Sequence, residues 1–160
     1  MNHYQHTMTL KASPAAVYAA LTTAEGLRAW WTEDCDIATA VGGELAFRFG
    51  AHHKEMRIER MVPCNEVQWL CTGAHIEVDS FTRKDEWVGT RIVFHLAQDG
   101  DSGTRVRFDH VGLVPAFECY GVCSEGWQHF LSSLEKYVET GHGTPYHSVA
   151  RAPESTHLQE

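Results

Sequence analysis

The fold is decided by Glu125-Gly126-Trp127-Gln128-His129-Phe130-Leu131-Ser132-Ser133-Leu134-Glu135-Lys136-Tyr137-Val138-Glu139-Thr140-Gly141. One face of this stretch carries apolar residues at helical spacing: Trp127, Phe130, Leu131, Leu134, Tyr137 and Val138. Gly141 stands where a left-handed C-cap belongs, and Pro145 opposes a restart of the helix. The pattern predicts a long amphipathic helix, which needs an apolar surface to cover.

The residues before this helix alternate between apolar and polar, as is typical of strands with one buried face. Turn residues separate the runs, notably Gly42-Gly43, Cys64-Asn65 and the segment 99–103. The alternation predicts strands over residues 4–10, 44–49, 56–62, 67–71, 87–97 and 104–112. Because short turns join neighbouring runs, we expect an antiparallel sheet.

Two short helices are predicted between the first two strands. Ser13-Pro14 supplies an N-cap and a residue preorganised for the first turn, and Thr23 can cap a second helix. Trp30 and Trp31 lie on the apolar side of this second helix, where we expect them to plug the core. Strands fill the middle of the chain and the long helix comes last, so the predicted fold class is α+β.

Length and charge restrict the class of protein further. The 160 residues, 43% of them hydrophobic, predict one domain over residues 1–145 and a flexible polar tail over 146–160. A formal net charge of -8 disfavours nucleic acid and anionic lipid surfaces as partners. No secretory signal or membrane-length apolar run is visible, so we expect a soluble, cytoplasmic protein without a membrane partner.

The five cysteines contain no CxxC pair, which predicts reduced thiols rather than a disulfide framework or a zinc ribbon. Cys119 and Cys123 stand one helical turn apart, but no second pair of Cys or His has matching ligand spacing. Packing on a buried helix face is therefore favoured over a metal site. Since no Gly-rich phosphate loop occurs either, we expect no metal and no cofactor.

Five stretches form a further pattern when taken in order: ASPAAVYAALT (12–22), LRAWW (27–31), Gly42-Gly43, TRVRFDHVG (104–112) and the segment from Gly126-Trp127 to Gly141. Their order and spacing resemble the START-like (SRPBCC) superfamily and, within it, the activator-of-Hsp90-ATPase homologue-like proteins. The resemblance implies a helix-grip fold. In that fold a curved antiparallel sheet wraps around the long C-terminal helix, and the two short helices close one end of the cavity between them.

Residues 72–85 depart from the compact hairpin expected between the middle strands, and the first ten of them look inserted. A lid over the cavity and an extra edge strand are two interpretations. A loop extension without a role is the third, and it is favoured because loops tolerate insertions at low thermodynamic cost.

His110 and Arg60 are the polar residues singled out for a role in the cavity. His110 shares the parity of Val106 and Phe108, so it should point inward, where it could orient a ligand oxygen, exchange a proton or serve as a hydrogen-bonded core residue. Arg60 shares the parity of Ile58 and could meet a ligand carboxylate or a buried acid in the pocket, or lie in water at a strand end.

Other side chains are assigned to the wall of the cavity or to solvent. We place His52, His53 and His75 in loops. We expect them to be solvated rather than to bind a metal, because no third ligand has suitable spacing. The apolar wall is expected from residues on inward strand parities or the first turns of the long helix: Trp69, Phe94, Phe108, Tyr120, Cys123 and Trp127.

Three functions fit this pattern. The leading hypothesis is a protein that binds a small, largely hydrophobic molecule between the sheet and the C-terminal helix. The resemblance also allows a polyketide cyclase-like or other acid–base enzyme that uses the same pocket. A protein-interaction role like that of Hsp90 activators is the third, although this chain has room for a single domain. Formation of a homodimer is left open.

Overall fold

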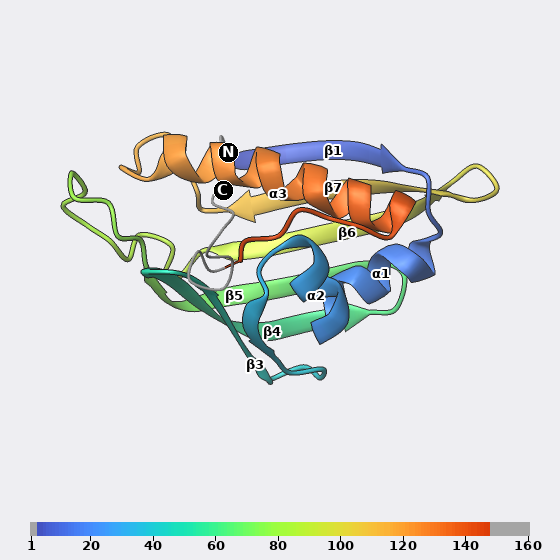
Figure 1. The fold of residues 1–160 in the computed structure, drawn as a ribbon, viewed down its shortest axis with the longest axis horizontal. Coiled ribbons are helices and arrows are strands. Elements are labelled where there is room, and N and C mark those ends of the chain that lie inside the picture. The colour runs from blue at the N-terminus through green and yellow to red at the C-terminus, as the bar shows by residue number, and fades with distance from the viewer. Residues whose placement is uncertain (1–2, 148–160) are drawn as a thin grey trace, which may run out of the picture.

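The computed structural model describes residues 3–147, which form one seven-stranded antiparallel sheet and three helices (Figure 1). The sheet order is β1-β7-β6-β5-β4-β3-β2. The elements in chain order are β1 (Tyr4–Leu10), α1 (Pro14–Thr22), α2 (Ala24–Trp30), β2 (Asp34–Ile37), β3 (Glu44–Phe49), β4 (His52–Val62), β5 (Glu66–His75), β6 (Arg91–Asp99), β7 (Gly103–Val111) and α3 (Tyr120–Thr140). The predicted α+β helix-grip fold is confirmed.

The helix α3 lies across the concave side of the sheet, alongside β1 and β7 (Figure 1). Its buried face presents Trp127, Leu131 and Leu134 to the sheet. The Trp127 ring lies 4.5 Å from the ring of Phe108 on β7. Gly141 ends the helix in the left-handed conformation, with φ of 89°, as the sequence predicts. The surface that the amphipathic helix requires is therefore the inner face of the sheet.

The two short helices form as predicted. The side chains of Ser13 and Thr23 each accept a first-turn backbone N–H, which caps the two helices. Trp30 donates its indole N–H to the carbonyl of Ala20 at 2.8 Å and so ties α2 to α1. The backbones approach so closely that a Cβ on Gly26 would lie 2.6 Å from the Ala20 Cα atom. Trp30 and Trp31 are both buried, in agreement with the prediction.

Three strand boundaries in the middle of the sheet differ from the sequence prediction. The strand expected from residue 87 begins at Arg91, because a turn precedes it, in which Thr90 N–H donates to the Trp87 carbonyl at 2.9 Å and Gly89 has φ of 91°. The strand β4 begins already at His52, and β5 runs to His75. The three histidines assigned to loops therefore lie in strands, and His53 stacks on His75 at 5.8 Å.

Residues 72–85, which look inserted in the sequence, have two parts. The first part continues β5 to His75 and pairs with the beginning of β4. The second part belongs to the segment 76–90, which turns back over the end of the cleft described below. Lys84 holds the two sides of this segment together, because its ammonium group donates to the carbonyls of Val78 and Phe81 at 2.9 and 3.0 Å. Glu118 accepts two further backbone N–H groups from it.

The boundary predicted for the tail is wrong at its first residue. Tyr146 donates its backbone N–H to the Trp31 carbonyl at 2.9 Å, and its own carbonyl accepts from Glu33 at 3.0 Å. Its ring packs against Phe49 at 5.8 Å. Hydrogen bonds and aromatic contact need no sequence periodicity, which is why the pattern missed them. The prediction for residues 148–160 lies outside the described residues.

Candidate functional site

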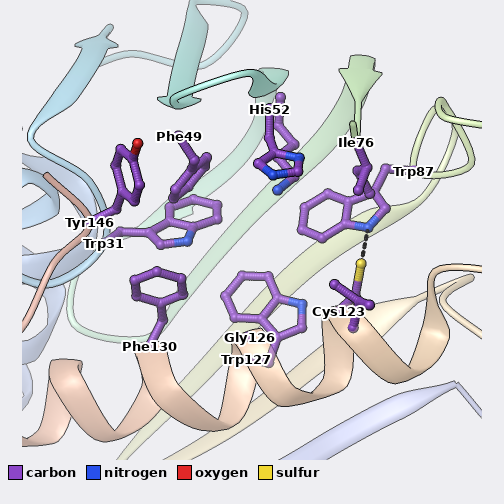
Figure 2. A pocket seen from close by; sticks show the side chains of 12 residues that line it. Trp31, Phe49, His52, Ile76, Trp87, Cys123, Gly126, Trp127, Phe130 and Tyr146 are labelled. Carbon is purple, nitrogen blue, oxygen red and sulfur yellow. Dashed lines mark hydrogen bonds between the residues drawn. The ribbon is translucent and has the colours of Figure 1, made fainter. Parts of the chain in front are cut away.

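A cleft of about 290 Å³ opens between the sheet and α3 (Figure 2). The C-cap of α2, the adjacent ends of β3 and β4, the segment 76–90 and one side of α3 all contribute to it. We call it the aromatic cleft and define it by its lining residues: Trp31, Phe49, His52, Lys54, Ile76, Trp87, Val122, Cys123, Gly126, Trp127, Phe130 and Tyr146. Six of these twelve side chains are aromatic rings of Phe, Tyr or Trp, so the cleft suits a flat or apolar molecule.

The indole rings form a continuous wall along the cleft (Figure 2). Trp127 lies 5.3 Å from Trp31 and 5.9 Å from Trp87, the latter pair nearly parallel at 13°. Behind this wall Trp31 stacks on Trp69 at 6.0 Å. Because each ring packs against others, the wall is held in place before any molecule enters.

Lys54 is the cation of the aromatic cleft. Its Nζ atom lies 4.6 Å from the ring centroids of both Phe49 and Trp87, within the range of cation–π attraction. No residue between 3 and 147 forms a hydrogen bond or ion pair with Nζ. Burial disfavours the charged form and lowers the pKa of Lys54 below its usual value. The cleft therefore contains an amine that is neither solvated as at a surface nor paired.

The position of Lys54 follows from the alternation of β4. His52, Lys54 and Met56 point to the same side, and in the register with β3 they stand opposite Phe49, Phe47 and Leu45. Those three β3 residues are buried in the core. A lysine on this face of β4 must therefore point into the interior, where the core borders the cleft.

His52 presents a second nitrogen to the cleft. Its Nδ1 atom accepts the backbone N–H of Glu77 at 2.9 Å, so the proton of the neutral ring is on Nε2. Burial lowers the pKa of His52, and the nearby Lys54 lowers it further, so the neutral ring dominates at neutral pH. The sequence prediction of a solvated loop histidine is wrong for this residue.

His110 lies in the interior, completely buried, as its parity on β7 predicts. Its Nδ1 atom accepts the indole N–H of Trp127 at 3.0 Å, and its Nε2 atom lies 2.9 Å from the Thr90 hydroxyl. That hydroxyl donates to the Trp87 carbonyl at 2.6 Å, so Nε2 is the donor to Thr90. Burial lowers the pKa of His110 to about 3, with Lys54 and His3 contributing. Both nitrogens are thus used within the protein, behind the indole wall rather than in the aromatic cleft.

Arg60 does not point into the cleft, and the expectation from its parity is wrong in this respect. The register between β4 and β5 shifts between Ile58 and Arg60, which reverses the faces beyond that point. Arg60 is exposed, and its Nε atom lies 3.1 Å from a carboxylate oxygen of Glu66. A bulge of this kind leaves no mark in the alternation.

Of the six residues predicted to form the apolar wall, Cys123 and Trp127 line the cleft. Trp69, Phe94 and Phe108 are buried in the core behind it, and Tyr120 is half-buried at the start of α3. Contact of any of these side chains with a ligand stays a prediction.

The cysteines near the cleft are arranged around Lys54. The Trp87 indole N–H donates to the Cys123 sulfur at 3.1 Å. The Cys119 thiol, Lys54 and this N–H lower the pKa of Cys123, whereas burial raises the pKa of Cys71 to about 12. Within residues 3–147 no group of three or more His, Cys, Asp or Glu side chains is placed to hold a metal ion.

Sequence reasoning missed Lys54, His52 and Tyr146 as members of the site. The alternation of β4 contained the signal for the first two, since extending the parity of Met56 and Ile58 back along the chain reaches them. The strand predicted from the sequence begins at residue 56 and therefore leaves both of them out. Tyr146 had no such signal.

A curved antiparallel sheet that grips one long helix, with a cleft between the two, defines a helix-grip domain of the START-like class. The family model described as activator of Hsp90 ATPase homolog 1-like protein matches residues 11–139. The chain therefore belongs to this family. A search of curated proteins found no match.

Solved structures support the same assignment. The chain is 33% identical to the protein of the "solution structure of the Aha1 dimer" from Colwellia psychrerythraea, with a TM-score of 0.76 over 89% of this chain and 100% of that one. Protein MLL2253 from Mesorhizobium loti is 19% identical, with a TM-score of 0.66 over 83% of this chain and 95% of that one. CalU16 from Micromonospora echinospora is 16% identical, with a TM-score of 0.64 over 88% of this chain and 75% of that one. The last two share the fold.

No helix within residues 3–147 combines the length and the apolar character needed to cross a bilayer.

Proposed function

We propose that this protein binds a small, largely hydrophobic molecule in the aromatic cleft. The observation that carries the proposal is the preformed wall of Trp31, Trp127 and Trp87, which borders about 290 Å³ of open volume. Apolar surface that stays open to water is unfavourable, and transfer of an apolar ligand onto it is favourable. The fold supports the proposal, because the cleft lies where a helix grip leaves space between sheet and helix.

Two glycines of α3 allow a matched test. Gly126 lines the cleft and Gly121 does not, and in both positions an added Cβ meets no atom within 4 Å. A leucine at position 126 would project into the cleft, whereas one at 121 would project into solvent. Both substitutions replace glycine in a helix by a better helix former, so neither should disturb folding.

We expect the neutral fluorophore N-phenyl-1-naphthylamine to bind the wild type and to bind Gly126→Leu at least about tenfold more weakly, since the side chain occupies its space. Gly121→Leu should bind like the wild type. Fluorescence titration measures all three affinities. Failure of the wild type to bind, or equal binding by Gly126→Leu, would contradict the proposal. If the expected affinities are found, native mass spectrometry of protein purified from its own source would identify a natural ligand by its copurifying mass.

We also infer that the chain forms a homodimer, because the relative from Colwellia psychrerythraea, 33% identical over 89% of this chain, is described as a dimer. Multi-angle light scattering of the purified protein should give twice the mass of 18.0 kDa. A single-chain mass at micromolar concentration would contradict this inference and leave the binding proposal unaffected.

A further inference from the structure

We propose that the aromatic cleft selects amphipathic anions, which are molecules with an apolar body and one carboxylate, sulfonate or similar anionic end that Lys54 binds. The inference rests on the proposed function, since it names the class of ligand for the same cleft. Among residues 3–147, the positive charge of the Lys54 ammonium group is not balanced by a nearby carboxylate that is free to pair with it.

No carboxylate of residues 3–147 that lies near Lys54 is free to neutralise it. Glu55, its neighbour in sequence, lies on the other face of β4 and contacts His53 at 2.8 Å. Glu77 contacts His75 at 2.6 Å. Glu86 accepts the backbone N–H groups of the two residues directly before α3, at 3.1 and 3.2 Å. An ammonium group in an apolar site is costly without a counter-ion, so a bound anion would remove this cost.

The unpaired side-chain nitrogens of the cleft are donors. The Lys54 ammonium, the His52 Nε2–H group and the Trp31 indole N–H have no hydrogen-bond partner among residues 3–147. The indole N–H groups of Trp87 and Trp127, by contrast, are used by Cys123 and His110. A ligand that satisfies the free nitrogens must supply acceptor oxygens, and an anionic oxygen does so most strongly.

The surroundings of Lys54 favour an anion that carries an apolar body. Phe49 and Trp87 each present a ring face to the Lys54 Nζ atom. An anionic group bound to Nζ would therefore lie next to these aromatic rings. The chain as a whole has a formal net charge of -8, which repels small anions at long range. An inorganic anion would therefore gain little here, whereas an amphipathic one also gains the burial of its apolar part.

Burial lowers the pKa of Lys54, and a paired anion acts in the opposite direction by favouring the ammonium form. Other titratable groups that face Lys54 are Cys71 on β5, Cys119 and Cys123 at the beginning of α3, and the histidines 52 and 110. None of these is a carboxylate. Within the part of the chain that the structure describes, negative charge next to Lys54 would thus require a thiolate, whereas a bound anion supplies it directly.

The test compares two fluorophores with the same apolar body. 1-Anilinonaphthalene-8-sulfonate carries a sulfonate, and N-phenyl-1-naphthylamine is its neutral counterpart. In Lys54→Met, which keeps an unbranched side chain but removes the charge, we expect the affinity for the sulfonate to fall about tenfold or more. The affinity for the neutral fluorophore should stay within about twofold, which also shows that the variant is folded. Lys136→Met, at an exposed position of α3 away from the cleft, is the control and should leave both affinities unchanged.

Two further variants guard against an unfolded product. Lys54→Gln should reproduce the loss, and Lys54→Arg should retain preference for the sulfonate. Equal affinity of Lys54→Met and wild type for the sulfonate would overturn the inference, as would an equal loss for both fluorophores. If neither fluorophore binds the wild type, or if Gly126→Leu weakens neither, the proposed function itself fails. The two failures are therefore distinguishable.

Discussion

Replacing Trp127 by alanine should lower the free energy of unfolding by about 3 to 5 kcal/mol, the usual cost of removing a large aromatic side chain from a core. Trp127 is 2% exposed, packs against Phe108 at 4.5 Å and stacks near Trp87 at 5.9 Å. The substitution would leave a void under α3 and an unsatisfied acceptor on His110. Urea unfolding measures the effect.

Trp127→Phe separates the two contributions. It retains a ring in the core but removes the N–H that donates to His110 Nδ1. We expect a smaller loss, of about 1 to 3 kcal/mol, from the unpaired imidazole nitrogen and the reduced volume. If Trp127→Ala unfolds at nearly the same urea concentration as the parent, Trp127 does not anchor α3 to the sheet.

His110 should make the stability depend on pH between about 6.5 and 3. Burial lowers its pKa from 6.5 to about 3 in the folded protein. Between these values the unfolded chain binds a proton that the folded chain does not, so acid favours unfolding. The stabilisation by the neutral ring is complete above pH 6.5 and is lost as the pH falls toward 3. Each pH unit in this range corresponds to roughly 1.4 kcal/mol, so the loss between pH 7 and 5 is about 2 kcal/mol.

His110→Gln isolates this contribution from the carboxylates that also titrate in acid. A glutamine can accept from Trp127 and donate to Thr90, but it does not titrate. We expect the difference in unfolding free energy between the parent and this variant to shrink by about 2 kcal/mol from pH 7 to 5. Identical pH dependence of the two proteins would show that His110 is not held neutral.

The sequence allowed the fold to be predicted because its signals are local. Each signal depends on residues close together in the chain: the C-cap Gly141, the N-caps Ser13 and Thr23, and the alternation of β7. The structure agrees with all of them. His110 could be placed in the interior for the same reason, since the register between β6 and β7 has no shift.

The cleft was harder to predict because it depends on structural features that the alternation of apolar and polar residues does not reveal. The register shift after Ile58 moves Arg60 to the surface. Tyr146 reaches the cleft through backbone pairing with Trp31 and Glu33, which lie more than a hundred residues earlier. Lys54 was accessible to the same parity argument as Met56, but the strand predicted from the sequence begins at Met56 and does not include it. At this site the charge indicates a cleft.

The segment 76–90 has a consequence for how this architecture can diversify. It contributes Ile76 and Trp87 to the cleft. Lys84 and Glu118 hold its backbone between residues 78 and 83, whereas Gly89 and Thr90 at its end pair with Cys71 of β5. Changes in its length would reshape one end of the binding space and leave the pairing of the strands intact. Part of the ligand preference is thus encoded outside the strands and α3, so mutation in this segment can alter the cleft at a lower cost to folding than mutation of Trp127.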